Sequence, residues 1–238
     1  MAAGASTYRP IAPADRIAQP RRGGRPNPPL KPGQHPSGTL LAFDAKTGRQ
    51  LWQQTDDIFG TQLALSVPHR VLLMYYQAVP HKFFRLPSEV GGRIAALDAD
   101  TGRLLWDRQS EYQTRPMIVG ERVYAQGAAW DLRTGTPIAF DFHRSYGCGQ
   151  ISAGAHMLLF RSATLGYWDL RRRDSLQNFG GVRPGCWINA IPAGGIVLVP
   201  EGSSKCVCSY QMQAWIALIG ERSGEETPRA NERNQHAP

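Results

Sequence analysis

The sequence has no hydrophobic run long enough to cross a membrane as a helix, and only four of its 238 residues are cysteine. Its most apolar stretch, residues 190–200, is interrupted by Pro192 and by Gly194 and Gly195. A membrane-spanning helix needs about 20 consecutive apolar residues, so no span is predicted. Residues 1–10 contain no apolar segment of the length found in secretory signals, so no targeting signal is predicted from them.

The motifs of several enzyme classes are also missing. No serine stands in a Gly-x-Ser-x-Gly elbow, and no glycine-rich phosphate loop occurs. The histidines lack the spacings that place two metal ligands on one face, and no stretch clusters the roughly six to eight oxygens that calcium needs. The sequence therefore assigns no catalytic residue and no metal ligand, and it predicts no cofactor.

Proline and positive charge are concentrated at the start of the chain. The protein carries 27 Lys and Arg against 19 Asp and Glu, a net charge of +8. Residues 1–39 hold eight of the 18 prolines and six basic residues against Asp15 alone. Because proline removes backbone donors, this arm is predicted to be disordered, and the polar residues 221–238 are predicted to form a second disordered tail. No aromatic side chains interleave the basic residues, so no specific nucleic-acid partner is predicted.

One nine-residue pattern, Asp-Ala-x-Thr-Gly-x-x-x-Trp, occurs twice. A weaker third copy follows, and a decayed fourth at Asp169 loses the Thr-Gly pair. The four Asp positions are about 42 residues apart on average, close to the ~40 residues of a four-stranded propeller blade. The recurring positions are Asp44, Thr47, Gly48 and Trp52, then Asp98, Thr101, Gly102 and Trp106, then Asp131, Thr134 and Gly135.

Each copy predicts a β-hairpin. Asp and Thr side chains can bond nearby backbone groups and Gly accepts a positive φ, which favours a tight turn between two short apolar strands. The spacing predicts an all-β fold, a β-propeller of four-stranded antiparallel blades with about four to five blades over residues 40–220. The long first interval predicts an insertion around residues 77–90.

Two Trp-Asp pairs, at Trp130 and Trp168, also fit the period of WD40 propellers. The two best copies, however, have Phe-Asp and Leu-Asp at that place, with Thr-Gly and a Trp four residues beyond the Gly. This combination resembles the pyrroloquinoline-quinone (PQQ) type of propeller repeat, which occurs in quinoprotein dehydrogenases and in propellers that bind no quinone. The resemblance implies that Trp52 and Trp106 pack between adjacent blades.

The last third of the chain resembles the closing, C-terminal part of bacterial PQQ-binding-like β-propeller repeat proteins. The resemblance is carried by Tyr146-Gly147-Cys148, Gly185-Cys186 and Cys206-Val207-Cys208-Ser209-Tyr210. It extends over residues 40–220, and such proteins are commonly exported. Quinoprotein dehydrogenases of this superfamily close eight blades, so we expect the chain to be a fragment of a longer propeller. A small closed ring and a ring completed by another chain are the alternatives.

The four cysteines, Cys148, Cys186, Cys206 and Cys208, allow three full pairings. Side chains alternate along a strand, so Cys206 and Cys208 would face opposite ways and each could meet one of the other two. Two disulfides are predicted, which implies an oxidising compartment, periplasmic or extracellular. A four-thiolate zinc site and free buried thiols remain the alternatives.

Two functions are compatible with these residues. The first is a non-catalytic propeller module of an exported bacterial protein, which serves as a structural or partner-binding domain for another protein or for the rest of a longer propeller chain. The alternative is a divergent or partial PQQ-dependent dehydrogenase, which would hold PQQ with calcium. Candidates for a polar or cofactor-binding site are Arg144, Tyr146, Arg161, Asn178, Arg183 and Asn189, although such side chains can also bond backbone carbonyls between blades.

Overall fold

The structure is a computed structural model, and it describes residues 37–60, 62–75, 92–110, 112, 114–144, 147, 149–172, 176–185, 188–201, 210, 212 and 214–220. These residues form strands and no helix, so none of them belongs to a helix that could span a membrane. The predictions that lie outside the described residues concern the arm up to residue 36, the insertion around residues 77–90, the tail 221–238, Tyr146 and all four cysteines.

The strands form five antiparallel sheets in chain order. The first sheet has two strands, β1 (Leu40–Phe43) and β2 (Gln50–Gln54). The second has β3 (Gln62–Ser66), β4 (Val71–Tyr75), β5 (Arg93–Asp98) and β6 (Leu104–Gln109). The third has β7 (Met117–Val119), β8 (Arg122–Ala125), β9 (Ala128–Asp131) and β10 (Pro137–Ile138). The fourth has β11 (Ser152–Ala153), β12 (Met157–Ser162), β13 (Thr164–Asp169) and β14 (Gln177–Phe179). The fifth has β15 (Ile191–Ala193), β16 (Ile196–Val199) and β17 (Ile216–Ile219).

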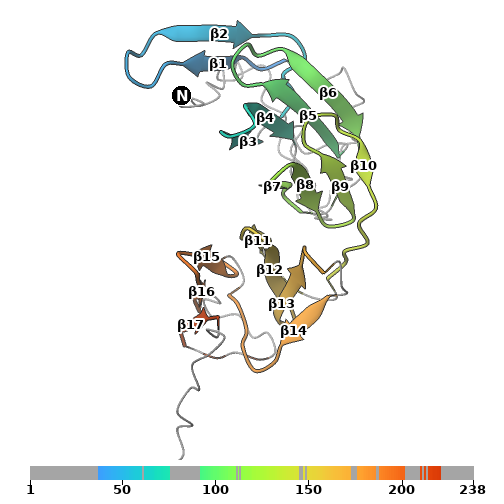
Figure 1. The fold of residues 1–238 in the computed structure, drawn as a ribbon, viewed down its shortest axis with the longest axis vertical. Helices are drawn as coiled ribbons and strands as arrows, with labels where there is room; N and C mark the ends of the chain where they lie inside the picture. The colour runs from blue at the N-terminus through green and yellow to red at the C-terminus, as the bar shows by residue number, and fades with distance from the viewer. Residues whose placement is uncertain are drawn as a thin grey trace, which may run out of the picture.

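The sheets follow one another along an arc, with the first sheet at one end and the fifth at the other (Figure 1). The strands that come first in the second to fifth sheets, β3, β7, β11 and β15, contact one another in that order. These four strands therefore form the inner edges of successive blades. The predicted all-β propeller of antiparallel, mostly four-stranded blades is confirmed, and the described sheets do not close into a ring.

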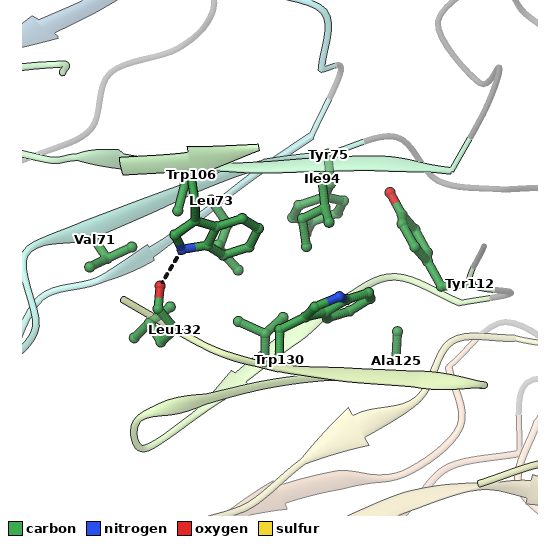
Figure 2. Packing of buried hydrophobic residues seen from close by; sticks show 11 residues of the cluster. Val71, Leu73, Tyr75, Ile94, Trp106, Tyr112, Ala125, Trp130 and Leu132 are labelled. Atoms are coloured by element: carbon green, nitrogen blue, oxygen red, sulfur yellow. Dashed lines mark hydrogen bonds between the residues drawn. The ribbon is translucent and has the colours of Figure 1, made fainter. Parts of the chain in front are cut away.

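The hydrophobic core lies between consecutive sheets. Along β4, Val71 and Leu73 belong to a buried cluster with Trp130 of the third sheet, whereas the alternating Leu72 and Met74 pack toward the first sheet. Figure 2 shows the first of these clusters, in which side chains of β4, β5 and β6 meet those of the third sheet. A strand whose two faces are both covered has a continuous run of apolar residues in its sequence, rather than alternating apolar and polar residues. This explains the sequence of β4, Val-Leu-Leu-Met-Tyr.

Candidate partner-binding surfaces

The turn between β5 and β6 is built by one carboxylate. Asp98 Oδ1 accepts hydrogen bonds from the Asp100 amide at 3.0 Å, and from the amide and the hydroxyl of Thr101 at 2.9 Å each. The Gly102 amide donates to the Asp98 carbonyl at 2.8 Å, and Gly102 has a φ of +73°. A residue with a side chain is strained at such a φ, which is why glycine stands here. Asp131, Thr134 and Gly135 repeat the same geometry.

Each of these two turns is covered by a tryptophan of the preceding sheet. Trp106 Nε1 donates to the Leu132 carbonyl at 2.9 Å, and a Cβ on Gly135 would lie only 2.5 Å from the Trp106 ring. Trp52 Nε1 likewise donates to the Ala99 carbonyl at 3.0 Å, and a Cβ on Gly102 would lie 2.6 Å from the Trp52 ring. The indole therefore occupies the space that a side chain on the glycine would need.

The strand that carries the tryptophan makes one more bond to the same glycine. Gln54, two residues after Trp52, donates from Nε2 to the Gly102 carbonyl at 3.1 Å. Arg108, two residues after Trp106, donates from Nε to the Gly135 carbonyl at 3.2 Å. We call this set the Trp–Gly contact: an indole over the turn glycine, its Nε1 on the carbonyl after the Asp, and a donor two residues on. It occurs between the first and second sheets and between the second and third.

The seam between the third and fourth sheets is built differently. Ala139 stands where the pattern would place a tryptophan after Gly135, and Arg173 stands where it would place the glycine after Asp169. Phe140 instead meets Trp168 with the ring centroids 5.4 Å apart. Asp169 accepts hydrogen bonds from Arg171, and these bonds lower the pKa of its carboxyl from 3.8 to about 2. At this seam the tryptophan and its receiving glycine are missing together.

The turn between β1 and β2, residues 44–48, has the same internal geometry as the covered turns. Asp44 Oδ1 accepts from the Lys46 amide at 3.0 Å, from the Thr47 amide at 2.8 Å and from the Thr47 hydroxyl at 2.9 Å. These hydrogen bonds, those from Thr47 first, lower the pKa of Asp44. Gly48 has a φ of +71°, yet no described atom lies within 4 Å of the place its Cβ would take. Its surface is exposed, whereas Gly102 and Gly135 are buried.

The fifth sheet leaves one apolar face uncovered by any described sheet. Val197 and Val199 of β16 pack on the fourth sheet, so the alternating Ile196 and Leu198 face the other side. The register places each of these two residues between one residue of β15 and one of β17. The resulting face holds Ile191, Leu198 and Ala217 in one row, and Ala193, Ile196 and Ile219 in the next. Ile191 is 41% exposed and Ile219 is 76% exposed.

A row of polar side chains links the inner edges of four sheets. Arg115 Nε donates to Gln62 Oε1 at 2.8 Å, and the Arg115 amide donates to Gln150 Oε1 at 3.4 Å. Asn189 Nδ2 donates to the Gln150 carbonyl. Arg115, Gln150 and Asn189 each stand two residues before an inner strand, a shared position that identifies the row once the strand order is known. Of this row, only Asn189 was among the predicted candidates.

The other predicted polar candidates do not gather at one place. Arg161 on β12 and Arg183 are completely buried. Asn178 is exposed on β14, the strand of the fourth sheet farthest from its inner edge. Arg144 is half-buried, and Tyr146 lies outside the described residues. The structure thus separates Asn178 from Asn189, which stands at the inner edge.

The polar row of the described inner edge does not form a calcium site. Calcium takes about six to eight oxygen ligands, and the amide oxygens of Gln62 and Gln150 accept hydrogen bonds from Arg115, whose guanidinium is itself a cation. Within the described residues no group of three His, Cys, Asp or Glu side chains could hold a metal ion. We therefore derive no catalytic step through PQQ or calcium.

Successive antiparallel sheets pack face to face, and the first three carry the same Asp-x-x-Thr-Gly turn between their last two strands. This arrangement defines a β-propeller of PQQ-type repeats. A family model described as outer membrane protein assembly factor BamB matches residues 34–171, and the chain belongs to this family. No curated protein matches the chain significantly.

Solved structures with the same kind of fold give partial matches. BamB from Moraxella catarrhalis has 15% sequence identity and a TM-score of 0.46, with 67% of this chain and 48% of that chain covered. The computationally designed Ika4 protein has 18% identity and a TM-score of 0.44, with 66% and 89% covered. A europium-containing methanol dehydrogenase has 19% identity and a TM-score of 0.29, with 43% and 21% covered. The chain spans about half the length of the BamB structure.

Proposed function

We propose that this chain is a non-catalytic propeller module of an exported bacterial protein, and that it binds another protein through the uncovered face of its fifth sheet. The observation that carries the proposal is the apolar face of Ile191, Ala193, Ile196, Leu198, Ala217 and Ile219, paired in register in two rows. Within the chain, comparable apolar faces of the second, third and fourth sheets are packed against a neighbouring sheet.

The proposed partner presents an apolar β-sheet face. Burying one large aliphatic side chain contributes about 1.5–3 kcal/mol, so covering Ile191 and Ile219 would stabilise a complex appreciably. The family description supports a role of this kind, because BamB is described as an assembly factor for outer membrane proteins. This chain matches the family model over residues 34–171, and the proposal extends a role in binding other proteins from the family description to this chain.

A photo-crosslinking amino acid at position 219, in the protein expressed in its native cells, tests the surface. We expect crosslinks to one defined protein, and we expect Ile191→Asp in the same chain to abolish them because a carboxylate would be buried in the contact. The matched control places the crosslinker at Gln177, which is exposed on the fourth sheet. Equal crosslinking from both positions, or none from position 219, would show that the face is not a binding surface.

The non-catalytic part of the proposal has its own test. Purified protein supplied with PQQ and calcium should bind no stoichiometric quinone and should reduce no dye with alcohols or sugars. Robust quinone-dependent turnover would establish the dehydrogenase alternative instead.

A further inference from the structure

We propose that the free edge of β17 is a docking site for an extended strand of a partner protein, which pairs its backbone with Ile216–Ile219. The docked strand carries large apolar side chains at alternate positions, on the side that faces the fourth sheet. The site uses the edge of the fifth sheet rather than its uncovered face, so it does not rest on the function proposed above.

The strand order shows that this edge is open. The second, third and fourth sheets each have four strands, whereas β17 is the third and last strand of the fifth sheet. Within the described part of the chain, β17 pairs with β16 alone. An edge strand presents a row of backbone N–H and C=O groups that a further strand can bond. The fifth sheet therefore has room for one more strand at this edge.

The composition of β17 separates it from the outer strands of the other sheets. Natural proteins protect their exposed sheet edges with polar or charged side chains and with proline. The outer strands β2, β6 and β14 have the sequences QLWQQ, LLWDRQ and QNF, and β10 begins with Pro137. The sequence of β17 is IALI, which contains none of these protecting residues. This edge is thus suited to pairing with another strand.

Phe179 of β14 indicates where an added strand would lie. Phe179 pairs with Leu165, so both side chains point to the same side of the fourth sheet. Leu165 belongs to a buried cluster with Val199 of the fifth sheet, yet Phe179 is 47% exposed. In the second sheet, by contrast, Trp106 of the outer strand is 6% exposed because it packs on the third sheet. An apolar side chain on a strand added to β17 would cover Phe179.

The two ends of the chain are poor sources of this strand. Residues 1–36 contain eight prolines, which cannot donate to a strand ladder. Residues 221–238 contain no Val, Ile, Leu, Phe, Tyr or Trp, and therefore lack the apolar side chains that would cover Phe179.

A second copy of this chain does not fit the edge through its own β17. The twofold axis of an antiparallel pair of identical edges is perpendicular to the joined sheet, so both fourth sheets would lie on the same side of it. Each fourth sheet has one strand more than the fifth, and the two β14 strands would need the same space. We therefore assign the docked strand to a different protein.

The test uses the ¹⁵N-labelled full chain and a capped peptide, Lys-Thr-Ile-Thr-Ile-Thr-Lys, as the probe strand. Two matched peptides carry backbone N-methyl groups, one on both Ile residues and the other on the second and third Thr residues. Neighbouring residues of a strand direct their N–H groups to opposite sides. Only one of the two methylated peptides would thus lose the hydrogen bonds to β17.

We expect the amide signals of Ile216–Ile219 to shift with the unmodified peptide at a Kd of about 0.1–1 mM. One alternating pair of these amides, either Ile216 and Leu218 or Ala217 and Ile219, should gain protection from hydrogen exchange. One methylated peptide should bind like the unmodified peptide, and the other should bind at least about tenfold more weakly.

Three variants test the position of the strand. Phe179→Ala should weaken the binding by about fivefold, because the docked side chain loses its apolar contact. Leu104→Ala is the matched control, since Leu104 is 52% exposed on the outer strand β6, and it should leave the binding unchanged. Ile191→Asp, which disrupts the uncovered face, should also leave it unchanged, so the edge and the face are tested separately.

Absence of shifts in β17 at about 2 mM peptide would overturn the proposal, and so would equal binding of the two methylated peptides. If all four amides of β17 are already protected in the free protein, the chain itself covers the edge and the assignment to a partner is wrong. If the same amides shift with protein concentration alone, the occupant is a second copy, which also contradicts the assignment.

Discussion

The indole of Trp106 lies over Gly135 of the neighbouring sheet, and its Nε1 donates to the Leu132 carbonyl at 2.9 Å (Figure 2). The two residues belong to consecutive copies of one sequence pattern. The pattern therefore supplies both a turn and the side chain that covers the next turn, so that a local repeat specifies a contact between sheets.

Substitution of Trp106 should separate the packing of the indole from its hydrogen bond. Trp106→Ala should lower the free energy of unfolding by about 3–5 kcal/mol, because a buried ring is lost. Trp106→Phe retains an aromatic ring but leaves the Leu132 carbonyl without its donor, at a cost of about 1–3 kcal/mol. Urea denaturation measures both. Trp52→Ala, at a half-buried position, should cost less, and an equal or larger loss there would contradict this ranking.

Alanine at the turn glycines should reveal which turns are covered. Gly48→Ala and Gly120→Ala add only the strain of a positive φ, about 1–2 kcal/mol, because open space surrounds both positions. Gly135→Ala carries the same strain and also displaces the Trp106 ring, so it should be clearly more destabilising. Thermal unfolding of the three variants tests this order. A Gly48→Ala variant as unstable as Gly135→Ala would mean that the first turn is covered after all.

Arg93 should be the charged side chain whose loss most weakens the second sheet. Its guanidinium bonds Asp107 and Asp57 and lies 4.0 Å from the centroid of the Phe59 ring. Arg93→Met should destabilise the protein by roughly 2 kcal/mol, because two carboxylates lose a partly buried partner. Asp57→Asn is the milder control, since Asp57 is 61% exposed. If Arg93→Met unfolds at the same urea concentration as the native protein, this cluster contributes nothing.

Acid should destabilise the protein through its turn carboxylates. Hydrogen bonds from Arg171 lower the pKa of Asp169 from 3.8 to about 2, so the folded protein favours the ionised form. Its contribution is fully present above pH 3.8 and is lost as the pH falls toward 2. The lowered pKa of Asp44 acts in the same direction. Thermal unfolding between about pH 2 and 6 should show the loss, and Asp169→Asn should reduce its slope. An unchanged slope in this variant would remove Asp169 from the explanation.

The cysteines give a prediction that depends on the compartment. Non-reducing peptide mapping of exported protein should find two disulfides that use Cys148, Cys186, Cys206 and Cys208. Four free thiols would rule out the disulfides. A stoichiometric zinc ion would favour the thiolate site.

The fold could be predicted from the sequence more completely than the candidate binding surfaces could. Asp98 and Gly102 act within one short segment, so their types and spacing are sufficient to predict a turn. The inner polar row depends on Gln62, Arg115 and Gln150, which are far apart in the chain and meet only once the sheets are stacked. Arg115 and Gln150 each stand two residues before an inner strand, but which strands are inner is known only from the strand order.

The buried arginines illustrate a second limit. Arg161, one of the candidates for a polar site, is completely buried near the end of β12. A single arginine within an apolar strand carries no information about the side to which it points. The uncovered face of the fifth sheet was missed for a related reason, since Ile196-Val-Leu-Val199 has the same composition as a strand covered on both sides.

The contacts between β3 and β7, β7 and β11, and β11 and β15 link the second to fifth sheets in chain order, and a buried cluster joins the first sheet to the second, so the five sheets form a linear array. In such an array the free energy of unfolding is approximately the sum of one contribution from each sheet and one from each interface between neighbouring sheets. The cooperativity of unfolding is therefore limited by the weakest of these interfaces, or junctions. The first and fifth sheets each have one described neighbour, so their amides should exchange with solvent sooner than those of the second and third. A ligand bound at either end would add one more junction and raise the protection of the sheet next to it.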